Sequence, residues 1–399
     1  MYLVVPVFVP HAGCPHDCCF CNQKVISGSR KIPGTDEISG IIAKYETEAK
    51  RYPVTQIAFF GGSFTAIEPE VQEHYLKAAA PFLKKNGGFA DAIRISTRPD
   101  AIDEETVSRL KKYSVKVVEL GAQSMDDKVL ALSERGHTAE DTVRASKLLC
   151  ENGFVLGLQT MTGLPGADRK SDIITAERIA DLGPDFVRIY PTIVVKNTKL
   201  CRDYMAGTYK PMSVDEAVSL CSELCRIYVS RGIEIARIGL QSTDSIARSG
   251  EESEVAGGPY HEAFGQLVRS YDVLEAVSDA IKPVEKELEN PGTLTLVTDS
   301  KYFSDVLGQG KTNAEAFKER FGFSNVKVAA YGQSVSEIYR KRAGQIVSVR
   351  DVNVKEQSSQ KRLANISECS LIKRREMTGR DTSREFTDVV LKVDIVFFG

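Results

Sequence analysis

The sequence predicts an α/β fold, a partial (β/α)6 TIM-like barrel with a smaller C-terminal α+β domain, and two patterns support it. Short runs of β-branched, aromatic and aliphatic residues alternate with longer amphipathic stretches through residues 1–245. Strict alternation of this kind implies a parallel sheet with right-handed crossovers. The alternation then ends, so we expect a second domain at residues 246–399. A doubly wound sheet is the alternative arrangement.

The strands of the first domain are predicted from compact apolar runs. In chain order these are Val4–Val9, Gln56–Phe60, Ala92–Ser96, Lys116–Leu120, Phe154–Gln159, Phe186–Tyr190 and, as a further candidate, Ile233–Ile238. The segments between these strands have apolar residues at helical spacing, and several of these segments begin after an Asp, Ser, Thr or Pro that favours the start of a helix. These helix candidates are Glu37–Arg51, Glu68–Lys85, Glu104–Lys112, Ala139–Asn152, Lys170–Leu182 and Ser213–Arg231.

The second domain has weaker patterns. Gly250–Gly258 is rich in Gly, Ser and Glu and predicts a linker or mobile loop. The helix candidates are His261–Glu289 and Asn313–Phe321, and the strand candidates are Thr293–Thr298, Val326–Tyr331 and a terminal run, Val389–Phe398.

Composition indicates a water-soluble cytoplasmic protein. The chain has 42% hydrophobic and 27% charged residues, and it lacks a secretory signal and an apolar run of membrane-spanning length. Its net charge is −2, but residues 340–399 hold 13 Lys and Arg against 8 Asp and Glu, a net of +5, which leaves −7 for residues 1–339. A basic segment on an acidic body can hold an anionic partner such as RNA, although a solvated charged face is equally compatible.

Three cysteines after the first predicted strand have the spacing C-x3-C-x2-C. We call Cys14, Cys18 and Cys21 the cysteine triplet. Short cysteine spacings are typical of iron–sulfur ligands, and three thiolates leave one iron of a 4Fe-4S cluster open to a cofactor. A structural zinc site completed by His11 or His16 is the main alternative, whereas an odd and sparse set of nine cysteines argues against disulfides.

Polar or Gly-rich segments follow the next four predicted strands. In a parallel sheet the carboxyl ends of the strands meet at one edge, where binding sites form. These segments are Gly61–Thr65, Thr97–Asp100, Gly121–Ser124 and Thr162–Gly166. Because the cysteine triplet follows the first strand and these segments follow the next four, we predict that they form one site at this edge.

At these positions the chain resembles the radical S-adenosylmethionine (SAM) core of the catalytic subunit of Elongator, the tRNA wobble-uridine modifying enzyme. The motifs that carry the resemblance are Phe60–Phe64, Thr97–Asp100, Glu119–Ser124, Arg135–Thr138, Met161–Gly166, Ile189–Thr192 and Lys196–Thr198. The resemblance implies a 4Fe-4S cluster, reductive cleavage of SAM to a 5′-deoxyadenosyl radical, and an external electron donor of flavodoxin or ferredoxin type.

The resemblance also implies roles for individual residues. The cysteine triplet would ligate the cluster, and Phe20 would pack near the adenine of SAM. The backbone at Gly61, Gly62 and Ser63 would approach the methionyl amino group, since glycine has no side chain to obstruct it. Three further residues would line the SAM pocket, namely Arg98, Glu119 and Gln123.

Departures from the Elongator pattern leave the substrate open. The triplet spacing is the general radical SAM spacing, Gln159 stands where that family tends to have His, and no Gly-rich loop of an acetyl-CoA-binding domain is visible. tRNA modification near a wobble uridine, a small-molecule reaction like that of oxygen-independent coproporphyrinogen oxidase, and a zinc-stabilised nucleic-acid-binding module are the three hypotheses. Cys201, Cys221 and Cys225 could hold a second metal, although core packing is favoured.

Overall fold

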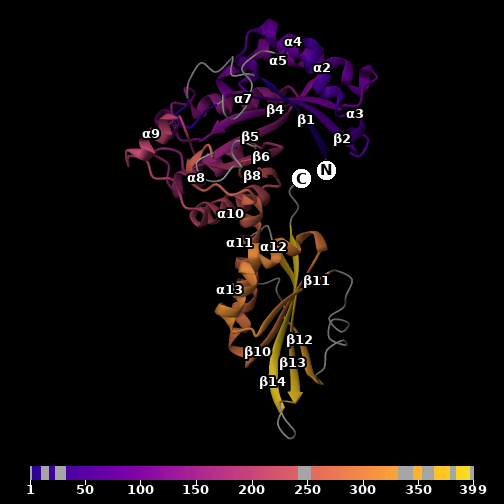
Figure 1. The fold of residues 1–399 in the computed structure, drawn as a ribbon, viewed down its shortest axis with the longest axis vertical. Helices are drawn as coiled ribbons and strands as arrows, with labels where there is room; N and C mark the ends of the chain where they lie inside the picture. Colours follow the sequence, from indigo (N-terminus) through magenta and orange to yellow (C-terminus); the bar gives the residue numbers. More distant parts are fainter. Residues whose placement is uncertain are drawn as a thin grey trace. The chain divides into compact units, whose positions relative to one another are not determined.

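The computed structural model describes residues 2–9, 18–22, 33–240, 253–330, 345–352, 364–377 and 383–395. They form two compact units, which consist mainly of Met1–Ala217 with Arg231–Glu262 and of Val218–Ser230 with Ala263–Phe397 (Figure 1). The predicted domain boundary between residues 245 and 246 lies outside the described residues. No helix in the described part of the chain is both long enough and apolar enough to cross a bilayer.

The first unit contains a curled sheet of seven strands in the order β1-β2-β3-β4-β5-β6-β8, and every neighbouring pair is parallel. Each strand therefore lies beside the strand of this sheet that follows it in the chain, and the sheet forms a half-barrel. This confirms the partial barrel, because a doubly wound sheet would reverse its strand order at a switch point. The strands are β1 (Tyr2–Val9), β2 (Val54–Gly61), β3 (Ala92–Thr97), β4 (Val115–Gln123), β5 (Val155–Thr162), β6 (Phe186–Pro191) and β8 (Glu234–Ile238).

Helices connect these strands, and side-chain caps fix where several of them begin. Thr138 and Asp141 form a capping box at α7, and Asp168 and Ser171 form another at α8. Each cap satisfies backbone N–H groups of the first helical turn and so sets where the preceding loop ends. The connecting helices are α2 (Thr35–Ala43), α3 (Glu46–Ala49), α4 (Pro69–Ala79), α5 (Glu104–Lys112), α6 (Asp127–Leu132), α7 (Ala139–Glu151), α8 (Arg169–Asp181), α9 (Lys199–Met205) and α10 (Val214–Ser230).

Two local features differ from the sequence prediction. Strand β4 continues three residues beyond Leu120, so Gly121 lies within a strand and not in a loop. The predicted loop Gly250–Gly258 contains a strand, β9 (Val255–Gly257), which pairs antiparallel with β7 (Val194–Val195). Strands of two or three residues are too short to show a period in the sequence, and their pairing depends on a distant partner.

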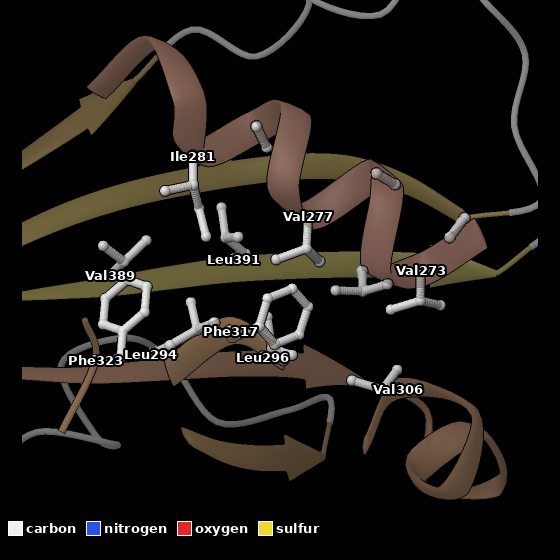
Figure 2. Close-up of a cluster of buried hydrophobic side chains, with 14 of the residues drawn as sticks. Val273, Val277, Ile281, Leu294, Leu296, Val306, Phe317, Phe323, Val389 and Leu391 are labelled. Atoms are coloured by element: carbon white, nitrogen blue, oxygen red, sulfur yellow. The ribbon is translucent and has the colours of Figure 1, made fainter. Parts of the chain in front are cut away.

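The second unit has a five-stranded mixed sheet in the order β11-β10-β14-β13-β12. Buried side chains of α11 face the sheet, and Figure 2 shows Val277 and Ile281 pointing toward Leu391 of β14. Residues 389–395 of the predicted terminal strand form the second half of a longer strand, and residues 396–398 lie outside the described residues. Strand β13 lies in a polar stretch without regular apolar alternation. The elements are α11 (Phe264–Ile281), β10 (Pro291–Thr298), α12 (Phe303–Leu307), α13 (Thr312–Phe321), β11 (Asn325–Ala330), β12 (Gln345–Val352), β13 (Ala364–Met377) and β14 (Ser383–Ile395).

Candidate active site

The carboxyl ends of the parallel strands bring the predicted site residues to one edge of the half-barrel. Strand β2 ends at Gly61, β3 ends at Thr97 and β4 ends at Gln123. The segment with Cys18 and Cys21 follows β1 at the same edge, while Cys14 lies outside the described residues. Three of the sequence motifs and two of the three triplet cysteines are therefore parts of one region.

Backbone hydrogen bonds tie the cysteine segment to two distant parts of the first unit. The Cys21 amide donates to the Cys18 carbonyl at 3.0 Å, which closes a tight turn between the two triplet residues. The Cys19 amide donates to the Ser133 carbonyl at 3.1 Å, and its carbonyl accepts from the Leu200 amide at 2.8 Å. Two thiols on one turn that is anchored on both sides have the chemistry and the placement of ligands to a single soft metal centre.

Cys19 packs into an apolar cluster. It is 1% exposed and packs with Val194 and Leu200. Burial raises the pKa of its thiol to about 12, so the group stays protonated and does not supply a thiolate. The ring of Phe20 packs against the same cluster. The predicted contact of Phe20 with adenine stays a prediction.

Arg98 is fully buried and holds two loops together. Its guanidinium makes a two-point ion pair with Asp100, at 2.9 and 3.0 Å, and donates to the carbonyl of Arg135 at 2.7 Å. Arg98 is therefore an interior residue, and its predicted contact with SAM stays a prediction. Its third nitrogen, Nη1, is buried and has no hydrogen-bond partner among the described residues.

Arg135 carries the contact from this loop to the cysteine segment. Its Nη1 donates to the Cys18 sulfur at 3.4 Å, and its Nη2 donates to the Gly121 carbonyl at 2.8 Å. A Cβ atom added at Gly121 would lie 2.8 Å from that Nη2 atom. Glycine at this position thus leaves room for the guanidinium against the strand.

Glu119 is the centre of a buried ion cluster that sequence reasoning did not find. Its carboxylate accepts a hydrogen bond from Arg94, makes an ion pair with Arg188 at 2.8 Å and accepts from Gln159 at 3.2 Å. These four side chains come from four neighbouring strands, β3 to β6. Three charged residues inside largely apolar strands, Arg94, Glu119 and Arg188, were the available signal, because a charge buried in a parallel sheet requires a partner.

The cluster extends toward the first two strands through Arg94. Its Nη1 donates to Gln56 at 3.2 Å and to the Tyr2 hydroxyl at 3.4 Å, and its guanidinium lies 4.5 Å from the centre of the Phe186 ring. Side chains of six strands thus form one polar layer within the half-barrel. The predicted contact of Glu119 with SAM stays a prediction, and its carboxylate already has three partners.

Several buried polar atoms near the strand ends have no partner in the described part of the chain. They include Oε1 of Gln123 and the hydroxyls of Thr162 and Thr192. Gly61 has a φ of +112°, a backbone conformation that glycine adopts without strain. Ser63, two residues later, is buried. Since buried polar groups are normally hydrogen-bonded, unpaired ones at the carboxyl ends of the strands fit a polar cofactor such as SAM at this edge.

His137 has a structural contact in this region. Its Nε2 donates to the Ala122 carbonyl at 3.2 Å, and the side chain is 4% exposed. Burial and the neighbouring guanidinium of Arg135 lower its pKa to about 4, so the imidazole is neutral at pH 7.

The glycine-rich segment at the end of β5, Thr162–Gly166, is held by hydrogen bonds to Asp172 and Tyr209. The Gly163 amide donates to Asp172 at 2.9 Å, and the Tyr209 hydroxyl donates to the Gly163 carbonyl at 2.7 Å. Burial raises the pKa of the Asp172 carboxyl to about 7. The loop conformation is therefore coupled to a carboxyl group that titrates near neutral pH.

The proposed second metal site is not supported. Cys221 and Cys225 are fully buried in α10, and burial raises the pKa of the Cys225 thiol. No group of three or more His, Cys, Asp or Glu side chains within the described ranges is arranged to hold a metal ion. Core packing, the favoured interpretation, accounts for these two thiols.

Comparison with known proteins identifies two domain models in the chain. Residues 8–176 match the model described as the Radical SAM superfamily, and residues 184–272 match the one described as the Radical_SAM C-terminal domain. The first match includes the cysteine triplet and all the predicted SAM contacts. It confirms the predicted cofactors, a 4Fe-4S cluster and SAM, and it confirms that the chain is an enzyme.

The curated relatives include tRNA-modifying proteins. A tRNA uridine(34) acetyltransferase of Methanocaldococcus jannaschii is 29% identical over 259 residues, which cover 55% of this chain and 48% of that protein. Elongator complex protein 3 of Homo sapiens is 25% identical over 182 residues, covering 41% of this chain and 33% of that protein. The chain thus spans about half, or less, of the length of these relatives.

A solved structure supports the fold. The archaeal Elp3 of Methanocaldococcus infernus, with an N-terminal deletion, has a TM-score of 0.53 and 24% identity, covering 68% of this chain and 62% of that one. This likeness agrees with the half-barrel described above.

Proposed function

The chain belongs to the radical SAM superfamily, and from this membership we propose that it modifies tRNA at or near a wobble uridine. The observation that carries the proposal is the set of Elongator-like motifs gathered at the carboxyl edge of one half-barrel, in a chain whose relatives include tRNA uridine(34) acetyltransferases. The bound cofactors supply the radical chemistry. Acetyl transfer is not part of the proposal, since the match covers 48% of the acetyltransferase.

In this function the protein's own residues organise the site. Cys18 and Cys21 hold the cluster together with Cys14, and the buried unpaired atoms of Gln123 and Arg98 are available to polar groups of SAM. An external donor of flavodoxin or ferredoxin type supplies electrons. A cytoplasmic location agrees with a tRNA substrate.

The charge distribution supports an RNA partner. Residues 340–399 have a net charge of +5 on a chain whose total is −2. Lys373, Arg374 and Arg375 lie in β13, which pairs with β12 at the edge of the second sheet, while Arg380 lies outside the described residues. Guanidinium and ammonium groups on one segment can contact successive phosphates.

The substrate is tested by mass spectrometry of tRNA nucleosides from cells with and without the gene. We expect a modified uridine to disappear on deletion and to return with the wild-type gene, but not with a Cys18→Ala gene. Unchanged nucleosides would contradict the RNA substrate and favour a small molecule. Zinc without iron in the purified protein would instead favour the nucleic-acid-binding module.

The RNA-binding role of the basic segment is tested by tRNA titrations across a salt series. Charge reversal of Lys373, Arg374, Arg375 and Arg380 should weaken binding, and each lost phosphate contact should reduce the log–log salt slope by about 0.7–0.9. A matched control reverses four exposed lysines of the first unit, at positions 77, 84, 112 and 147. Equal affinity and slope in the two variants would refute a specific role for the segment.

A further inference from the structure

We infer that Arg135 is a positioning residue that raises the reduction potential of the cluster by donating a hydrogen bond to the Cys18 sulfur. The inference rests on the proposed function only in that Cys18 ligates a cluster. It assigns Arg135, within the motif Arg135–Thr138, a role that neither the motif nor the family match specifies.

Two hydrogen bonds hold the guanidinium of Arg135, and a third holds its backbone. Nη1 donates to the Cys18 sulfur at 3.4 Å, and Nη2 donates to the Gly121 carbonyl at 2.8 Å. The backbone carbonyl of the same residue accepts from Arg98, which is itself held by Asp100. Arg135 is 8% exposed, so its charge is screened little by solvent.

One N–H donor of the Arg135 guanidinium has no acceptor among the described residues. Its Nε atom is buried and has no hydrogen-bond partner among the described residues, and the same is true of Nη1 of Arg98. Arg135 donates to the Cys18 sulfur, and Arg98 donates to the backbone carbonyl of Arg135. Two linked, buried guanidinium groups that retain unused N–H donors match the needs of an anionic group. A cluster with three thiolate ligands is such a group.

The direction of the effect follows from charge. One-electron reduction adds a negative charge to the cluster, and a fixed positive charge with an N–H donor on a ligating sulfur stabilises the reduced form more than the oxidised form. Arg135 therefore makes the cluster easier to reduce by the external donor. Its neighbour His137 does not add to this charge, because its pKa is lowered to about 4.

The test measures the midpoint potential of the reconstituted cluster by a dithionite titration followed by electron paramagnetic resonance. In Arg135→Gln, we expect about a tenfold lower ratio of reduced to oxidised cluster at a given ambient potential, a shift of about 59 mV to more negative values for a one-electron couple. Arg135→Lys keeps the charge and should recover part of the shift. Arg144→Gln is the matched control, since it removes a half-exposed guanidinium from α7 of the same unit.

Gly121→Ala is the second variant, and it retains the positive charges of both Arg98 and Arg135. The added Cβ would lie 2.8 Å from Nη2 of Arg135 and 2.8 Å from Nε2 of Gln123, so both side chains must shift. We expect the potential to fall in this variant too. It decides the matter if Arg135→Gln does not assemble a cluster.

The outcomes separate this inference from the proposed function. The inference would be overturned if Arg135→Gln assembles a cluster with wild-type iron and sulfide content and an unchanged midpoint potential. If Arg135→Gln assembles no cluster, the same result in Gly121→Ala would overturn it. Arg135 would then have a purely structural role. Wild-type protein that binds no iron would overturn the proposed function itself.

Discussion

Replacing Glu119 by Gln tests the buried ion cluster most directly. The substitution preserves the size of the side chain and removes its charge. Arg94 and Arg188 then lose their shared carboxylate, although the amide oxygen of Gln can still accept one hydrogen bond. Arg94 is 1% exposed and Arg188 is 15% exposed, so water cannot replace the missing partner at Arg94.

The magnitude follows from the burial of the partners. Removing one member of a buried ion pair typically destabilises a protein by about 3–5 kcal/mol, because it leaves an uncompensated charge. The remaining hydrogen bond of Gln should place Glu119→Gln near the lower end of that range. A triple variant, Glu119→Leu with Arg94→Met and Arg188→Met, should be much less destabilised than Glu119→Leu alone, because apolar replacement of a whole buried cluster is often neutral.

Urea denaturation followed by far-UV circular dichroism measures the effect, since the chain contains no Trp for fluorescence. Glu105→Gln is the matched control, because Glu105 pairs with Arg109 at 2.8 Å but its side chain is 82% exposed. We expect little change in the control. A loss below about 1 kcal/mol in Glu119→Gln, far short of the cost of a broken buried pair, would refute the cluster as a stabilising element of the folded interior.

Three further predictions concern the site. Replacing any residue of the cysteine triplet by Ala should abolish iron binding and SAM cleavage, whereas Cys19→Ala should keep both. Iron assays and the yield of 5′-deoxyadenosine measure these effects. Iron binding that depends on Cys19 alone would contradict the prediction. Gly62→Val should weaken SAM binding, measured by equilibrium dialysis with the cluster intact, because a branched side chain obstructs backbone approach to the cofactor; unchanged affinity would remove this loop from the site. The pKa of Asp172, about 7 in the folded state, lies above the unfolded value of about 3.9, so the folded state binds more protons between these values and the free energy of unfolding should fall as the pH rises from about 4 to 7. Asp172→Asn should flatten that part of the stability profile, and an identical profile would refute the link.

Local sequence patterns were sufficient to predict the architecture of the first unit. Runs such as Gln56–Phe60 show strand composition within a few residues, and Glu104–Lys112 shows the period of a helix with the same bounds as α5. Alternation then predicts parallel pairing, and parallel pairing predicts the edge where the site lies. The spacing of three cysteines on one loop indicated a metal site, with iron–sulfur favoured over zinc, and the resemblance of further motifs to the Elongator core implied the 4Fe-4S cluster and SAM.

The second unit was less predictable because its longest strand, β13, shows no regular alternation of apolar and polar residues. Strand β13, Ala364–Met377, is polar and contains the basic run at Lys373–Arg375, so no period of two identifies it. It is stabilised by pairing with β12 and β14 on both sides. Strand β9 was missed for a similar reason, since only its pairing with β7 defines it.

The contacts that organise the site were decided by tertiary structure. Arg94 and Glu119 are 25 positions apart, and Arg135 and Cys18 are 117 positions apart. The sequence determined that buried strands contain charges and that one loop holds a cysteine triplet. Only the curled sheet determined which charges pair, because each crossover places a strand next to its neighbour in a register that no local pattern encodes. Side chains remote in the chain therefore meet at the strand ends, and their partners follow from the packing of the half-barrel.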